Sequence, residues 1–227
     1  MATTADAPKR VTIEGDDLLE RSLAWVRGHR QFASWGGIVL VVAAGLFYWN
    51  RISTEQSERV ADSRLGSARL AFESNNYPLA ASELSQITVN YAGTNAAQQA
   101  TLLLAQVRMM QGQSDQASQM LSAFASSASS AYRAQAYGLL GATYENTSHP
   151  REAADAYLKA AAATALPFLK AQYLSDAGRA WTTSGDTTAA VKAYQEIATA
   201  LDSTGTATEA KVRLGELTKG AWKAPQK

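Results

Sequence analysis

The chain has 227 residues, with 21 basic and 20 acidic side chains, two histidines and no cysteine. The absence of cysteine excludes disulfides, thiolate zinc sites and cysteine nucleophiles, and a formal net charge of +1 gives no electrostatic reason to expect nucleic acid as a partner. This length accommodates one helical domain after an N-terminal segment and leaves no room for a separate catalytic domain.

Residues 1–30 form an N-terminal segment in which five acidic side chains balance five basic ones. Asp17-Leu-Leu-Glu20 has the spacing of a capping box, which predicts a short helix. Leu19, Leu23 and Val26 would share one face of it, so the helix is expected to be amphipathic. Two interpretations stay open: the helix rests at a membrane interface, or it docks a membrane partner.

Residues 31–51 are predicted to form a single transmembrane helix. No charged side chain occurs in residues 31–50, and this stretch spans roughly 27 to 30 Å as a helix, the thickness of a bilayer core. A buried helix of a soluble protein would need a larger protein around it, and a cleaved secretory signal would start nearer the N-terminus. Basic residues lie on both sides, so they do not fix the orientation. The small residues that would allow close packing of this helix against another are Gly36, Gly37, Ala44 and Gly45.

The stretch after the predicted crossing favours a continuous helix. Residues 52–65 contain neither proline nor glycine. We therefore expect one helix to run unbroken from the crossing into the domain that follows.

A small residue then returns at almost constant spacing, at Ala68, Ala105, Gly141, Gly178 and Gly215. Subtraction of these positions gives steps of 37, 36, 37 and 37 residues. A period in this range signals a repeat architecture, because one unit cannot bury its apolar face alone and must stack on its neighbours. We call these five positions the small-residue marks.

Each of the first four marks is followed by the same order of residue types. Alanine lies twelve residues later and a large side chain sixteen residues later, as in Ala153 and Tyr157, with the turn formers Asn75, Gly112, Ser148 and Gly185 in between. This order predicts a first helix, a tight turn and a second helix. The predicted repeat domain covers residues 52–220 and comprises units 61–96, 97–132, 133–169 and 170–206, a capping helix over 207–220, and a tail over 221–227.

The third unit carries the most specific motif. It reads Tyr137-x2-Leu140-Gly141-x2-Tyr144 and then Ala153-x3-Tyr157-x2-Ala160, which resembles the tetratricopeptide repeat. The expected fold is therefore all-α, with one N-terminal transmembrane helix, an α-solenoid of four tetratricopeptide-like helix pairs and a C-terminal capping helix.

In such a fold the candidate site is a surface, formed by the outward positions of the first helices. This predicted inner wall is polar with an apolar patch, and its two methionines would suit contact with varied extended peptides; the alternative that one methionine packs in the core stays open. The predicted protein-binding residues are Arg69, Phe72, Gln99, Gln106, Met109, Met110, Gln135, Glu145, Asn146, Gln172, Asp176 and Arg179.

Catalysis has little support in the sequence. Neither His29 nor His149 can be paired with a nucleophile or a metal shell. We expect no enzyme activity, no cofactor and no metal.

The crossing that ends in Phe47-Tyr48-Trp49-Asn50, followed at once by degenerate repeat units, resembles the bacterial YfgM-like family over about residues 13–220. The resemblance implies a single-pass inner-membrane protein with a cytoplasmic N-terminus and a periplasmic repeat domain. It also implies partners: subunits of the Sec translocon, a membrane-anchored prolyl isomerase and unfolded secretory clients. The expected function is that of a scaffold or holdase chaperone. The alternative is a structural or assembly subunit of another membrane complex, and the sequence leaves the oligomeric state open.

Overall fold

The computed structural model describes residues 30–223, and within these residues the only regular elements are helices. The predicted helix after Asp17 and the end of the tail lie outside the described residues. Along the chain the helices are α2 (Arg30–Glu73), α3 (Tyr77–Asn90), α4 (Asn95–Met110), α5 (Ser114–Ser127), α6 (Ser130–Asn146), α7 (Pro150–Ala163), α8 (Pro167–Ser184), α9 (Thr187–Ala200) and α10 (Ala207–Leu217).

Helix α2 is uninterrupted over its 44 residues. The prediction of an unbroken helix through residues 52–65 is therefore confirmed. The chain divides into two compact units, residues 1–55 and 56–227, and each is described by itself.

The transmembrane crossing predicted over residues 31–51 is not found. Within the described part of the chain, no helix combines the length and the apolar character that a membrane crossing requires. Side chains at positions 30–40, 46–47 and 49–51 lie outside the described residues, and Gly36 and Gly37 are among them.

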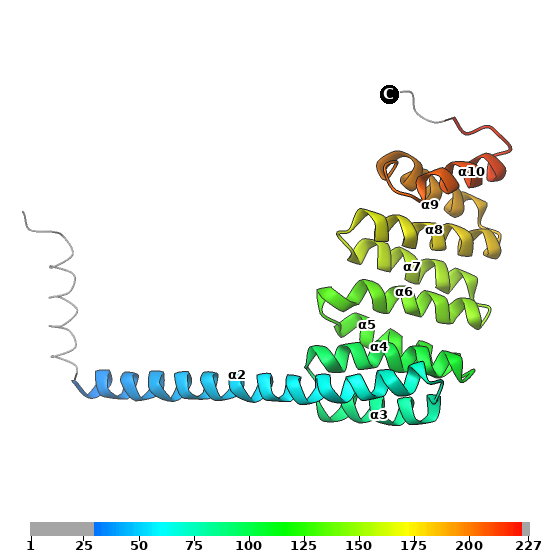
Figure 1. The fold of residues 1–227 in the computed structure, drawn as a ribbon. Helices are drawn as coiled ribbons and strands as arrows, with labels where there is room; N and C mark the ends of the chain where they lie inside the picture. The colour runs from blue at the N-terminus through cyan, green and yellow to red at the C-terminus, as the bar shows by residue number, and fades with distance from the viewer. Residues whose placement is uncertain (1–29, 224–227) are drawn as a thin grey trace, which may run out of the picture. The chain divides into compact units, whose positions relative to one another are not determined.

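From Gln56 onward the helices stack as antiparallel pairs in chain order (Figure 1). The end of α2 shares a hydrophobic cluster with α3 and α4, and the later pairs are α4 with α5, α6 with α7, and α8 with α9, followed by α10 on α9. Each second helix also packs against the first helix of the next pair, so the clusters follow one another as a continuous core. The expected all-helical repeat solenoid is confirmed.

Each turn between the two helices of a pair contains one residue in left-handed backbone conformation. These residues are Asn75, Gly112, Ser148 and Gly185, with φ values of 58°, 74°, 60° and 83°. All four lie seven residues after a mark, and they are the predicted turn formers, so this prediction is confirmed. Glycine adopts the conformation without strain, whereas a serine side chain is crowded in it.

The first four marks are small because a large side chain of the second helix lies against each of them. A Cβ atom added to Gly141 would lie 2.7 Å from the ring of Tyr157, and one added to Gly178 would lie 2.7 Å from the ring of Tyr194. In the first two units the corresponding residues are Ala68 with Leu84 and Ala105 with Leu121, and all four are fully buried.

Polar side chains of two first helices accept hydrogen bonds from backbone N–H groups at the start of the following first helix. The backbone N–H groups of Asn95 and Ala96, at the start of α4, donate to the Glu58 carboxylate at 2.8 Å each. At the start of α6, the N–H of Ser129 donates to Gln98 Oε1 at 3.0 Å. Because these groups lack partners inside their own helix, the contacts fix the spacing of α2, α4 and α6.

Candidate protein-binding wall

The outward face of the first helices, which we call the first-helix wall, contains two separate grooves. The first has a volume of about 420 Å³ and lies across α2, α4 and α6. Its lining is formed by Arg69, Phe72, Glu73, Gln99, Leu102, Leu103, Gln106, Tyr132 and Gln135. We call it the amide groove, because three glutamines contribute to it.

A chain of hydrogen bonds runs across the three helices of the amide groove. Arg69 Nη2 donates to Gln99 Oε1 at 2.5 Å, and Gln99 Nε2 donates to Tyr132 Oη at 3.0 Å. These two bonds hold the Gln99 amide in one orientation. Gln106 and Gln135 form no side-chain hydrogen bond within the described residues, so their amides can donate to and accept from a ligand.

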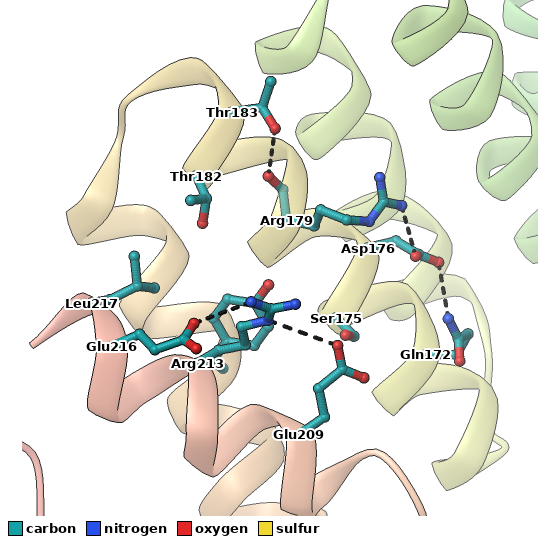
Figure 2. Close-up of a pocket in the computed structure, with 11 residues that line it drawn as sticks. Gln172, Ser175, Asp176, Arg179, Thr182, Thr183, Glu209, Arg213, Glu216 and Leu217 are labelled. Carbon is teal, nitrogen blue, oxygen red and sulfur yellow. Dashed lines mark hydrogen bonds and ion pairs between the residues drawn. The ribbon is translucent and has the colours of Figure 1, made fainter.

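The second groove lies where α10 packs beside α8 and α9, and has a volume of about 280 Å³. Figure 2 shows acidic and basic side chains of α8 and α10 projecting into it. We call it the charged groove. Its lining is formed by Gln172, Ser175, Asp176, Arg179, Thr182, Thr183, Tyr194, Glu209, Arg213, Glu216 and Leu217.

Each arginine of the charged groove lies between two carboxylates. Arg179 contacts Asp176 at 3.0 Å and also forms an ion pair with Glu145 of α6. Arg213 contacts Glu216 at 3.1 Å and Glu209 at 3.8 Å. The guanidinium groups are therefore engaged within the wall and are poorly placed to capture an anionic ligand.

Tyr157 connects this charged network to the core. Its ring is buried against Gly141, and its hydroxyl donates to Glu145 Oε2 at 2.8 Å. Burial, followed by the hydrogen bond to Glu145, raises the pKa of the Tyr157 hydroxyl well above its ordinary value of 10.0. The hydroxyl therefore stays protonated and fixes the position of Glu145, which in turn positions Arg179.

The structure brings most of the predicted wall residues together in these two grooves. Five line the amide groove and three the charged groove, and Glu145 lies beside the latter through Arg179. The first five are Arg69, Phe72, Gln99, Gln106 and Gln135, and the next three are Gln172, Asp176 and Arg179.

The remaining predicted residues line neither groove. Met109 packs against the core cluster that α4, α5, α6 and α7 share, in agreement with the alternative that one methionine belongs to the core. Met110 is 60% exposed at the end of α4, and Asn146 is exposed at the end of α6. In α2, Ala44 and Gly45 are exposed, and a Cβ added to Gly45 would meet no atom within 4 Å, while the burial of Gly36 and Gly37 is not described.

Sequence reasoning missed several lining residues, such as Leu103, and two further places supply polar ones. Tyr132 lies in the first turn of α6, and its contribution depends on its reach toward α4. Glu209, Arg213 and Glu216 belong to α10, which was expected to act only as a cap. The spacing of these three charges, four and three residues apart, places them on one helix face and could have indicated a functional surface.

The histidines give no sign of reaction chemistry. His149 is exposed in the turn before α7, with Nδ1 at 3.1 Å from Thr147 Oγ1, and His29 lies outside the described residues. Among residues 30–223, no group of three or more histidine, aspartate or glutamate side chains could hold a metal ion.

Comparison with known proteins identifies the type of repeat. Residues 55–167 match the family model of the tetratricopeptide repeat-like domain. One similar structure is a crystal structure of a putative kinesin light chain from Podospora anserina, which is described as having nearly identical TPR-like repeats. It superimposes on this chain with a TM-score of 0.56 at 17% identity, over 72% of this chain and 87% of that chain. A variant of the same repeats gives a TM-score of 0.57 with the same identity and coverage.

No curated protein matches the chain in sequence. The chain thus contains TPR-like repeats in an all-helical solenoid. Solenoids of this kind present extended binding surfaces to other proteins.

Proposed function

We propose that this protein is a scaffold or holdase chaperone that binds extended segments of other proteins in the amide groove. The observation that carries the proposal is the row of glutamines across α4 and α6, in which Gln99 is fixed by Arg69 and Tyr132 while Gln106 and Gln135 remain available. Phe72 and Leu103 supply apolar contact beside them.

The chemistry of the amide groove suits the main chain of a peptide. An extended segment presents N–H donors and C=O acceptors, and a glutamine amide can pair with both. Only one basic and one acidic side chain, Arg69 and Glu73, line the groove, so capture of a carboxyl terminus is not favoured. Recognition of main-chain groups tolerates many sequences, as a holdase requires.

The location and partners are part of the same proposal. The uncharged stretch over residues 31–50 and the resemblance to the YfgM-like family support an inner-membrane protein with a periplasmic repeat domain. Its partners would be subunits of the Sec translocon, a membrane-anchored prolyl isomerase and unfolded secretory proteins. Extraction of membranes with alkaline carbonate tests the location: the chain should stay in the membrane pellet, and its release into the supernatant would contradict an integral anchor.

Site-specific photo-crosslinking in cells tests the binding surface. Probes replacing Gln106 and Gln135 report on the amide groove, and a probe replacing Lys192, exposed on α9, serves as a matched control. We expect many newly made secretory chains to crosslink at the two groove positions and few at the control. One stoichiometric partner at all three positions would instead indicate a structural subunit.

A further inference from the structure

The N-terminal end of the solenoid exposes positions that the later units bury. Leu70, two residues after the mark Ala68, is 68% exposed, and Ser67, one residue before it, is also exposed. In the later units, the register position of Leu70 is occupied by Val107, Thr143 and Ala180, all 0% exposed. The register position of Ser67 is occupied there by Leu104, Leu140 and Ala177, which are at most 5% exposed.

The difference has a simple cause. In the later units these positions are covered by the second helix of the preceding unit, because α3 packs on α4, α5 on α6 and α7 on α8. Within the described residues, no helix covers the same face of α2 beyond Gln56. This face together with α3 is therefore an open end on which a further helix surface can pack.

The open end contains a groove of about 300 Å³ between α2 and α3. Arg64 lines it from α2 and Glu83 from α3, with Ser67, Leu79, Ser82 and Gln86 around them. Among the described residues, Arg64 and Glu83 do not pair with each other. The Arg64 guanidinium lies over the Tyr91 ring at 5.7 Å from its centroid, and Glu83 Oε2 is buried without a hydrogen-bond partner.

A buried acceptor without a donor is costly, and among the described residues no carboxylate forms an ion pair with the Arg64 guanidinium in the same groove. One groove thus offers a positive and a negative group on two different helices. A two-fold axis would bring the Arg64 of each copy toward the Glu83 of the other, which is the self-complementarity that an isologous interface requires.

We propose that the open ends of two copies of this chain pack against each other, with reciprocal pairing of Arg64 and Glu83. Leu70 and Leu79, which are 68% and 46% exposed, would become buried in the contact. Ser67, Ser82 and Gln86 keep the surface partly polar, which suits a reversible dimer and a face that is also stable in water.

The test uses the full-length chain, which contains no cysteine. Ser67→Cys and Ser82→Cys, introduced separately, give single thiols in the groove, and Ser122→Cys gives one on the exposed side of α5. A short bismaleimide should join two chains through the groove thiols and not through the control thiol.

Charge reversal then tests the pairing. Arg64→Glu and Glu83→Arg should each reduce the crosslinked dimer about tenfold, because like charges would face each other at both contacts. An equimolar mixture of the two variants should recover the dimer, since each supplies what the other lacks, and the double variant should recover it alone. Lys192→Glu, on α9, should have no effect.

Several results would overturn the proposal. One is crosslinking from the groove thiols that does not exceed the Ser122→Cys level. Another is a yield of crosslinked dimer that neither charge reversal changes. A third is a yield that both reversals lower but that neither the mixture nor the double variant restores, although both single variants retain their helical circular dichroism. Groove thiols that join to a different protein in native membranes would show that the open end serves another partner.

Discussion

The first two repeat units close their cores with alanine against leucine, whereas the next two use glycine against tyrosine. Both combinations place a small residue of the first helix opposite a large one of the second, sixteen positions later. They differ in what reaches the surface. Leu84 and Leu121 end in the core, while the hydroxyl of Tyr157 extends to Glu145 on the first-helix wall.

The difference separates the two grooves chemically. In units three and four, the tyrosine hydroxyl, carboxylates and arginines form a network that is already paired. In unit two, where Leu121 ends within the core, Gln106 lies beside Phe72 and Leu103 and has no side-chain hydrogen bond among the described residues, and Gln135 of unit three lines the same groove. The Tyr157 hydroxyl thus connects the core of the third unit to the wall, and variants of both kinds of core pair test that connection.

The largest effect should come from removing a large core partner. Leu121→Ala leaves a cavity against Ala105 and should lower the free energy of unfolding by about 2–5 kcal/mol, measured by urea denaturation. Leu158→Ala is the control, because Leu158 is partly exposed on α7; it should cost much less. Equal losses for the two variants would contradict the role of Leu121 as the counterpart of the mark.

The fit of glycine to tyrosine should be almost as sensitive. Gly141→Ala places a Cβ at 2.7 Å from the Tyr157 ring and should cost about 1–3 kcal/mol despite the better helix propensity of alanine. Adding Tyr157→Leu converts the pair to the type found in the first two units and should recover most of this loss.

A matched control is the mark of the capping helix, Gly215, at which an added Cβ has no neighbour within 4 Å. Gly215→Ala should stabilise the protein by about 0.5–1 kcal/mol. For the third unit, a double-mutant cycle of Gly141→Ala and Tyr157→Leu that shows no coupling energy would refute the fit of Gly141 to the Tyr157 ring.

The hydroxyl of Tyr157 should make a smaller, pH-dependent contribution to the free energy of unfolding. Tyr157→Phe removes the hydrogen bond to Glu145 and should cost about 1–3 kcal/mol near neutral pH, less if water replaces the hydroxyl. Because the folded state raises the pKa of this hydroxyl above 10.0, its stabilisation is fully present below pH 10 and is lost as the pH rises above it. Urea denaturation between pH 8 and 11 should show the difference between the parent and Tyr157→Phe shrinking above pH 10; a difference that grows would contradict the assignment.

The smallest effect should come from the turns. Ser148 has a φ of 60°, where Gly185 occupies the same register position with a φ of 83°. Ser148→Gly should relieve roughly 1 kcal/mol of backbone strain in the folded state, and the greater conformational entropy of glycine in the unfolded chain should offset part of this gain. The net result should be a higher thermal midpoint of unfolding. The reciprocal change, Gly185→Ser, should lower it, and a change in the same direction for both variants would argue against backbone strain.

Features that depend on neighbours along the chain could be predicted from the sequence. The marks and the turn formers Asn75 and Gly185 recur at fixed register, so one unit indicates the next. The same register placed Gln99, Gln106 and Gln135 on one face, because helix geometry determines which positions point outward.

Features that depend on contacts between helices could not be read in this way. Tyr132 joins the amide groove through its length and its bond to Gln99, and α10 contributes Glu209 and Arg213 because of its packing on α9. Met109 and Met110 are adjacent in sequence but differ in burial, since a rotation of about 100° about the helix axis separates them. The crossing over residues 31–51 was predicted from the length of an uncharged, apolar run, and no helix that could cross a membrane is found among the described residues.

The central claim is that the amide groove holds an extended polypeptide, and an affinity measurement tests it most directly. A fluorescently labelled, permanently unfolded polypeptide would be titrated with the purified full-length chain and followed by anisotropy. Gln106→Trp fills the groove, while Lys192→Trp adds the same side chain to the exposed side of α9. The account predicts that Gln106→Trp weakens binding about tenfold or more, equivalent to at least about 1.4 kcal/mol, and that Lys192→Trp leaves it unchanged. Equal affinities for the two variants would contradict it.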